Sequence, residues 1–298
     1  MDEFHKRLKV RHEPDQATPW LEVEYVDYED FTHFMQFING LDNIAQLRQQ
    51  RQRFFFRGQS SAEWTLKPAL VRLLEGMPLD NALAYEFDSI CYFRERAHLF
   101  CESLVPGQAE FLEWICLMQH FSAPTRMLDW TSSFTVALYF AAYEEPADAG
   151  AIWLVHAKPL WNWMRETYPR SELWNEERRR EVFSSCDSFV EFGRVAPPRL
   201  DGYDPDRKSE RITAQRGVFT VCEKLFVDHA VLIGEALRDG AAAEKNWPLV
   251  KIVISPEAKK FFRRHLSSLN ISAATLFPGT DGLGRTIAET IRVHRETI

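Results

Sequence analysis

The sequence predicts an α+β fold in which a mixed, largely antiparallel β core is flanked by helices, with more helices in the N-terminal half. Short apolar runs bounded by turn residues indicate strands, and longer stretches with apolar residues at helical spacing indicate amphipathic helices. The chain has 298 residues and no visible internal repeat. We expect one domain over residues 1–298, with an N-terminal extension and first strand at 1–26 and a core at 27–290.

The apolar patterns place the individual elements. The predicted strands are Leu21 to Val26, Phe54 to Phe56, Ala151 to Val155, Val218 to Val221, Leu249 to Ile254 and a short one within Ile271 to Pro278. The predicted helices are Asp27 to Leu41, Leu79 to Cys101, Ala109 to Phe121, Thr131 to Glu145 with a Ser or Thr cap, Glu172 to Val182, one that begins at Ser255 and a last one after Gly282. Prolines and a glycine between Arg194 and Asp206 predict a long surface loop.

Composition narrows the function. A net charge of −7 argues against broad electrostatic binding to duplex nucleic acid. Five cysteines without a Cys-x-x-Cys pair suggest neither a disulfide framework nor a zinc site, so we expect no metal. The N-terminus lacks signal-peptide features, and the longest apolar run, Phe134 to Tyr143, is too short for a membrane span. We therefore expect a cytoplasmic protein without a membrane partner.

The run Phe54-Phe55-Phe56-Arg57-Gly58-Gln59 delivers an arginine where a buried strand ends. A guanidinium stays charged and its planar fork suits carboxylate or phosphate. Two interpretations of Arg57 follow: a structural ion pair with one of the chain's acids, or a contact to an anion or nucleotide.

Further motifs carry a resemblance to a known family. They are the stretch from Gln119 to Ser133, the pattern Trp64-x-Leu66-x-Pro68-x-Leu70, Leu276-Phe277-Pro278, and Asp281-Gly282. Together with Arg57-Gly58, this set resembles the FRG-domain family of bacterial proteins. The matching positions extend from about Tyr28 to Ile287, which is nearly the whole chain.

The order of three elements is also similar to the ADP-ribosyltransferase fold, with its split sheet. These are Arg57, the Thr131-Ser132-Ser133 segment and a strand entered through Gln215-x-Gly217-x-Phe219. The resemblance implies NAD as a substrate. Arg57 would then hold the pyrophosphate or ribose, with Gly58 and Gln59 as further cofactor contacts, and Thr131, Ser132 and Ser133 would orient the nicotinamide ribose.

His120, Arg126 and Asp129 form a dense polar cluster between two apolar helices, which is typical of a site. His120 is either a hydrogen-bonded boundary residue or a base. Asp129 is either the cap of the next helix or a cofactor contact. Arg126 is expected to bond Asp129 or the cofactor.

The catalytic carboxylate is the open point. ADP-ribosyltransferases often carry a glutamate where this chain has Gln215, and a neutral amide supplies no negative charge to an oxocarbenium-like transition state. The charge would come from Glu210, Glu86 or Asp129, and without it the fold is a binding module. The candidate catalytic residues are therefore Arg57, Gln215, Glu210 and His120.

The resemblance favours NAD-dependent ADP-ribosyl transfer or NAD cleavage by a bacterial effector, as a toxin or in phage defence, with a small-molecule nucleotide and a protein or nucleic-acid target as partners. One alternative is nucleotide or nucleic-acid binding or metal-dependent cleavage, with Glu86, His120 and Asp129 around the ion, although no ligand spacing supports it. Another is an interaction scaffold. The nine tryptophans, among them Trp153, Trp161, Trp163 and Trp174, are either core residues or a base-stacking surface.

Overall fold

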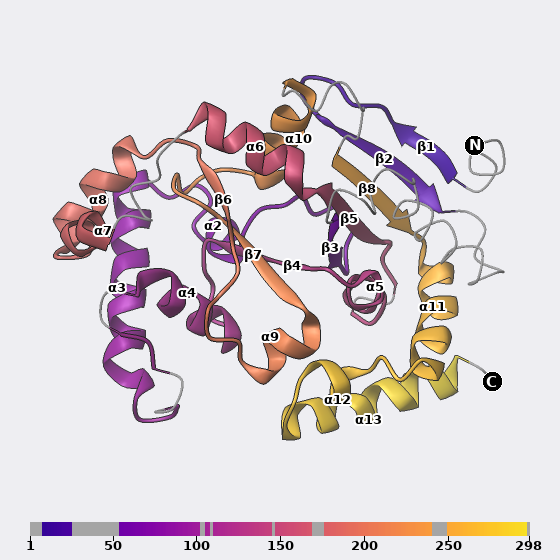
Figure 1. Cartoon of the computed structure of the whole chain (residues 1–298). Coiled ribbons are helices and arrows are strands. Elements are labelled where there is room, and N and C mark those ends of the chain that lie inside the picture. Colours follow the sequence, from indigo (N-terminus) through magenta and orange to yellow (C-terminus); the bar gives the residue numbers. More distant parts are fainter. Residues whose placement is uncertain are drawn as a thin grey trace.

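A single mixed sheet organises the molecule (Figure 1). The structure is a computed structural model, and it describes residues 8–25, 54–101, 105–107, 110–144, 147–168, 176–239 and 249–296. The described strands lie in the order β1-β2-β8-β5-β3-β4-β7-β6. All neighbours are antiparallel except β2 and β8, which are parallel. The predicted α+β class with a largely antiparallel core is confirmed.

The elements alternate along the chain. The strands are β1 (Leu8–His12), β2 (Trp20–Tyr25), β3 (Phe54–Gln59), β4 (Met127–Thr131), β5 (Gly150–His156), β6 (Leu200–Tyr203), β7 (Gly217–Cys222) and β8 (Leu249–Ile254). The helices are α2 (Ala69–Leu73), α3 (Leu79–Ala97), α4 (Phe111–His120), α5 (Phe134–Ala142), α6 (Ala157–Thr167), α7 (Glu176–Val182), α8 (Cys186–Val195), α9 (Glu210–Gln215), α10 (His229–Asp239), α11 (Pro256–Ser268), α12 (Ala273–Leu276) and α13 (Thr280–Arg295). None of the helices in these described ranges is long and apolar enough to cross a membrane.

Alternation along β3 distributes its side chains between two cores. Phe54 and Phe56 pack with α5 and α11 on one face of the sheet. Phe55 packs on the other face, where Trp153 is buried beneath α6 and α10. A third core joins α2, α3, α4 and α8 to β4 and β7 through Met127 and neighbouring apolar residues. Of these helices, α3, α4 and α8 lie on the left in Figure 1.

Strands β3 and β4 have the shortest pairing among the described strands of the sheet. These strands are joined through one registered pair, Phe56 with Thr131, whereas β3 pairs with β5 along its whole length. A continued antiparallel ladder would place Gly58 opposite Asp129, but the pairing has already ended. The resulting wedge inside the sheet positions the candidate site.

Helix α5 covers the wedge and approaches β3 very closely. A Cβ atom at Gly58 would lie 1.8 Å from the carbonyl oxygen of Ala137. Only glycine permits this contact between the helix backbone and the strand. Gly58 is therefore required for packing, whether or not it also touches a ligand.

Three elements differ from the prediction. Met127–Thr131 is strand β4, so the following helix begins only at Phe134; its N-cap residue Ser133 makes no side-chain cap bond. The polar residues Asp129 and Thr131 hide this strand, which is recognised only by its pairing with β7. Asp129 consequently lies in a strand and caps no helix.

The other two differences lie in the C-terminal half. The expected loop from Arg194 to Asp206 contains β6, which pairs with β7. The expected strand within Ile271 to Pro278 is helix α12, whose N-terminus has a capping box of Ser272 and Thr275. The predicted helix from Asp27 to Leu41 lies outside the described residues.

Replacing Gly58 with alanine should lower the free energy of unfolding by roughly 3 kcal/mol, because the new methyl group overlaps the backbone of α5. Urea unfolding measures the change. Gly284→Ala is the matched control: it lies within α13, and a Cβ atom there meets nothing within 4 Å. That substitution should raise stability by about 0.5–1 kcal/mol. Equal effects of the two variants would contradict the packing argument.

Candidate functional site

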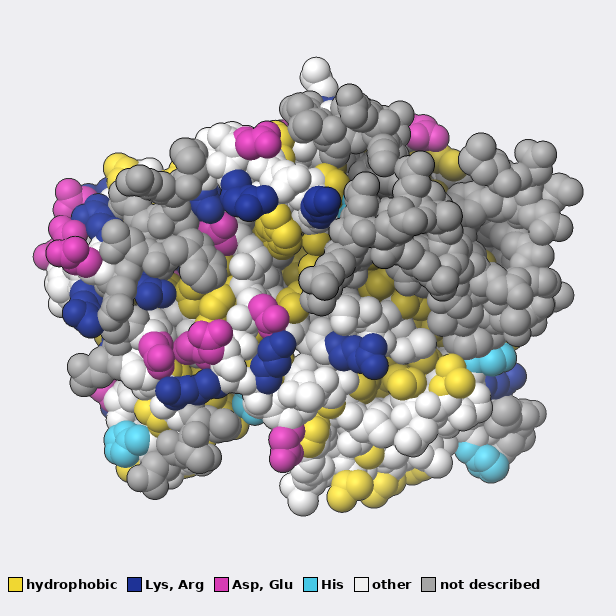
Figure 2. All heavy atoms as spheres, viewed as in Figure 1, with side chains coloured by type: hydrophobic (Ala, Val, Ile, Leu, Met, Phe, Trp, Pro, Cys, Tyr) yellow, Lys and Arg dark blue, Asp and Glu magenta, His cyan; other side chains and the backbone are white. Residues whose placement is uncertain are grey.

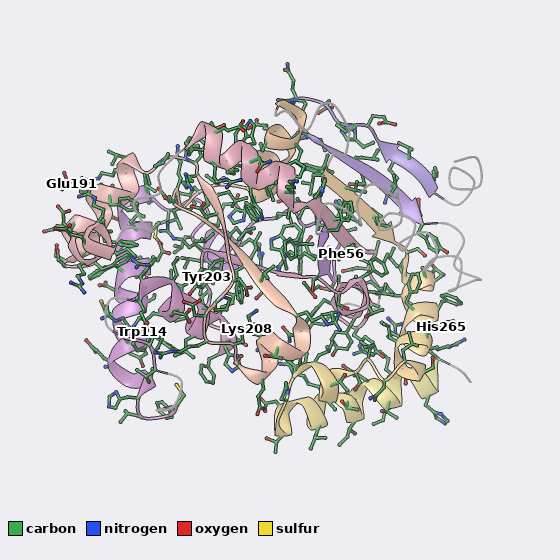
Figure 3. All side chains as sticks on the ribbon, in the orientation of Figure 1. Phe56, Trp114, Glu191, Tyr203, Lys208 and His265 are labelled. Carbon is green, nitrogen blue, oxygen red and sulfur yellow. The ribbon has the colours of Figure 1, made fainter. Side chains whose placement is uncertain are left out.

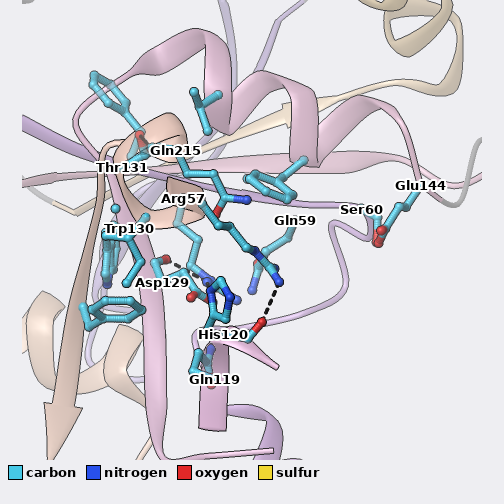
Figure 4. A pocket seen from close by; sticks show the side chains of 18 of the residues that line it. Arg57, Gln59, Ser60, Gln119, His120, Asp129, Trp130, Thr131, Glu144 and Gln215 are labelled. Carbon is cyan, nitrogen blue, oxygen red and sulfur yellow. Dashed lines mark hydrogen bonds and ion pairs between the residues drawn. The ribbon is translucent and has the colours of Figure 1, made fainter. Parts of the chain in front are cut away.

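A cavity of about 210 Å³ opens where β3 and β4 separate. Its walls come from β3, β4, the C-terminal end of α4, and helices α5 and α9. Figure 4 shows Arg57, Asp129, Gln119 and His120 converging, with Ser60 and Glu144 on the opposite side. Most of the residues singled out in the sequence therefore meet at one place.

Arg57 closes the wedge. Its Nη1 atom donates to the main-chain oxygen of Asp129 at 2.7 Å and lies 3.4 Å from the Oδ2 atom of the same residue. Burial lowers the pKa of the guanidinium, and the neighbouring carboxylate of Asp129 partly opposes this. Arg57 remains charged, since an arginine pKa stays far above neutral pH. It thus makes a structural contact and also lines the cavity.

One of the two oxygens of the Asp129 carboxylate is held by hydrogen bonding within the protein. Gln119 Nε2 donates to Asp129 Oδ2 at 2.8 Å. Gln119 is itself held, because Thr125 Oγ1 donates to its Oε1 at 2.5 Å. Among the described residues Asp129 Oδ1 has no hydrogen-bond partner, and the side chain is 52% exposed. One carboxylate oxygen is therefore oriented while the other is available to a ligand.

Two further arginines line the cavity, Arg72 from α2 and Arg211 from α9. Desolvation at the cavity wall lowers the pKa of each guanidinium. Acidic and basic side chains also lie side by side near the middle of the face shown in Figure 2. Arg57, Arg72 and Arg211 bring three positive charges to a cavity whose carboxylates are Asp129 and Glu144. This arrangement suits an anionic ligand.

The C-terminal segment borders the site. Two guanidinium groups contact the Phe277 ring, with the Arg211 and Arg285 guanidinium carbons each 4.7 Å from its centroid. Gln215 lines the cavity and donates from Nε2 to the Leu276 main-chain oxygen at 3.0 Å. The Gln215 amide nitrogen therefore binds the C-terminal segment. Its Oε1 atom accepts no hydrogen bond from any described residue and is available to a ligand.

His120 ends α4 at the cavity wall. Its Nδ1 atom lies 3.2 Å from Ser209 Oγ, and its main-chain oxygen accepts from Arg211 Nη1 at 2.8 Å. Burial and then the charge of Arg211 lower the pKa of the imidazole. A neutral ring at pH 7 is able to accept a proton.

The remaining predicted contacts are split between cavity and framework. Gln59 and Thr131 line the cavity, but their side chains hold neighbouring structure: Gln59 bonds Trp153 and the Thr65 carbonyl, and Thr131 Oγ1 donates to the Gln215 carbonyl. Ser132 and Ser133 do not line it. Ser132 is exposed at the end of β4.

Arg126 does not approach Asp129, contrary to expectation. It is buried, donates from Nε to Glu86 Oε1 at 2.6 Å, and makes a second bond from Nη2 to Glu86 Oε2. Its Nη1 donates to the carbonyls of Cys222 and Glu223. With these partners the guanidinium joins α3, β4 and β7, and it does not line the cavity.

Two of the carboxylate candidates lie elsewhere. Glu86 forms a buried ion pair with Arg126 and does not line the cavity. Glu210 is exposed in the first turn of α9 and does not line it either. Asp129 is the one of the three that reaches it. Within the part of the chain that the structure describes, no group of three His, Cys, Asp or Glu residues is placed to hold a metal ion.

Sequence reasoning missed Arg72, Arg211 and the buried Lys259. Arg72 and Arg211 have no local signal, because each lies in a short helix without a recognisable motif: Arg72 is the only charged residue of α2, and Arg211 follows Glu210 in α9. Lys259 is fully buried and donates from Nζ to the main-chain oxygens of Ser60 and Glu144, which both line the cavity. From the sequence, a lysine at the start of an amphipathic helix is predicted to lie on the surface; its burial follows only from the packing of that helix.

A buried polar chain lies near Arg57. Trp130 Nε1 donates to Thr220 Oγ1 at 3.0 Å, and that hydroxyl lies 3.1 Å from His229 Nδ1. The other ring nitrogen of His229 is buried without a partner among the described residues. Burial, followed by the charge of Arg57, lowers the pKa of His229 to about 3.

Residues 52–149 match the family model described as FRG domain. The chain contains an FRG domain. The matched range supplies Arg57, Gln119, Asp129 and Thr131, while Arg211 and Gln215 come from the part of the chain after the FRG domain. The chain matches no curated protein and no solved structure. The similarity to ADP-ribosyltransferases stays a prediction.

Removing the charge of Glu86 should destabilise the protein. Glu86→Gln leaves the buried Arg126 guanidinium without its counter-ion, which we expect to cost about 3 kcal/mol in the free energy of unfolding. Asp80→Asn is the control, because it removes the exposed pair with Arg194 and should change stability little. A stable Glu86→Gln protein that has lost its ligand would instead place Glu86 in the site.

Stability should fall on acidification because His229 binds a proton in the unfolded chain at a higher pH than in the folded protein. The folded pKa is lowered from 6.5 to about 3, so the unfolded chain binds the proton first. The free energy of unfolding therefore decreases as pH drops below the unfolded pKa, by about 2 kcal/mol for this group between pH 6.5 and 5. Urea unfolding of wild type and His229→Gln at both values tests this. NMR of the wild-type ring should show it neutral at pH 5, and a protonated ring would contradict the prediction.

Proposed function

We propose that the chain binds NAD in the cavity and breaks the bond between nicotinamide and ribose, passing the ADP-ribosyl group to water or to a target molecule. One observation carries this proposal: three guanidinium groups and one partly free carboxylate face the same cavity. Such an activity suits a toxin or a protein of antiphage defence, with a protein or nucleic acid as the target.

The arginines account for binding. NAD carries two phosphates, and guanidinium groups form charge-assisted bonds to phosphate oxygens. All three guanidinium groups are partly desolvated, and Arg57 and Arg72 also repel each other, which is unfavourable unless an anion is bound. A bound pyrophosphate relieves that repulsion. This preference for an anion supports the nucleotide hypothesis over a purely structural role of Arg57.

Asp129 accounts for the chemistry. As the bond between nicotinamide and C1 of the ribose breaks, its electron pair leaves with nicotinamide and positive charge develops on the ribose. The carboxylate, oriented by Gln119, stabilises that charge. The oxygen of water or a nucleophile of the target then bonds to C1 and loses a proton. His120, with its lowered pKa, is the group at the cavity wall that accepts this proton.

Replacing Asp129 with asparagine should reduce the rate of nicotinamide release by about 10²–10³-fold, because the amide keeps the shape but removes the negative charge. The affinity for NAD should change only a few-fold. Titration calorimetry measures the affinity, and chromatography of the NAD mixture measures nicotinamide.

Glu191→Gln is the matched control, since Glu191 is an exposed carboxylate on α8, away from Phe56 and the cavity (Figure 3). It should leave both quantities unchanged. Wild-type protein that gives neither heat nor nicotinamide with NAD would refute the proposed function. Heat without nicotinamide would show a binding module.

A further inference from the structure

We propose that Trp64 is the stacking platform for the adenine base of the bound nucleotide. This inference rests on the proposed function, and it adds the subsite that selects the adenine half. Two tryptophans line the cavity, Trp64 and Trp130. Trp130 is 3% exposed and its indole N–H is bonded to Thr220, whereas Trp64 is 42% exposed. Trp64 is therefore the one with ring surface for a ligand.

The turn that carries Trp64 is held in place on both sides. Ala62 N donates to the Ala149 carbonyl at 2.7 Å, and Gln59 Nε2 donates to the Thr65 carbonyl at 3.0 Å. Just beyond, His229 N donates to the Leu66 carbonyl at 3.2 Å. An aromatic ring on such an ordered backbone loses little conformational entropy when a base stacks on it.

Arg72 backs the ring. Its guanidinium carbon lies 5.6 Å from the Trp64 ring centroid, within the range of a cation–π contact. Arg72 is in turn anchored, because its Nη1 donates to the Lys67 carbonyl at 2.5 Å. The contact orients the indole, and Trp64 is still 42% exposed with Arg72 in place.

The order of side chains matches the order of groups in the dinucleotide. Trp64 contacts Arg72. Arg72 and Arg57 line the same cavity, and the charge of Arg72 contributes to the lowered pKa of the Arg57 guanidinium. Arg57 in turn contacts Asp129. A base on Trp64 would thus be followed by phosphates at the two arginines and by the ribose of nicotinamide at Asp129. The arrangement assigns the adenine, not the nicotinamide, to Trp64.

Three probes separate the two halves of the ligand: NAD, ADP and nicotinamide mononucleotide. Loss of one base–aromatic stack in Trp64→Ala should weaken NAD and ADP binding roughly 5- to 100-fold. Binding of nicotinamide mononucleotide should stay unchanged. Trp64→Phe, which keeps a π face, should restore most of the affinity. Titration calorimetry gives all three dissociation constants.

Tyr92→Ala is the matched control, because Tyr92 is also an exposed aromatic ring under a guanidinium, that of Arg96 at 4.0 Å, but it does not line the cavity. It should bind all probes like wild type. Unchanged NAD binding by Trp64→Ala, or equal weakening of the three probes, would overturn the platform while leaving NAD cleavage intact. Wild-type protein that binds neither NAD nor ADP would overturn both proposals.

Discussion

The early end of the pairing between β3 and β4 shapes the whole site. A sheet that opens internally leaves main-chain polar groups that need partners. Arg57 supplies one by donating to the Asp129 carbonyl, just past the pair of Phe56 and Thr131. Arg57, which bonds across the gap between the two strands, thereby also places a positive charge at the cavity wall. Structural and ligand-binding interpretations of Arg57 are two consequences of one position.

Buried charges hold the walls around this opening. Arg126 connects α3, β4 and β7 through Glu86 and two carbonyls, and Lys259 connects α11 to the carbonyls of Ser60 and Glu144. Burying charged groups costs solvation energy that their contacts only partly return. We infer that these contacts serve to fix the relative positions of the walls more than to add stability.

The candidate site extends beyond the matched FRG domain. Residues 52–149 contribute β3, the end of α4, β4 and α5, whereas α9 and the segment around Phe277 lie outside that range. Arg211 and Gln215 of α9 contact Phe277 and the Leu276 carbonyl, and the same two residues bond the matched range through the His120 carbonyl and the Thr131 hydroxyl. A binding site that needs both parts couples ligand affinity to the packing of the C-terminal helices.

The sequence by itself determined the α+β class, most strands and the long helices, because hydrophobic periodicity is a local property. It also singled out Arg57, His120, Asp129 and Gln215, which the structure brings to one cavity. It could not show that Arg126 turns to Glu86, or that Arg72 and Arg211 join Arg57. Those outcomes depend on which elements pack together, and charged side chains find their partners across distances in the chain that no local pattern records.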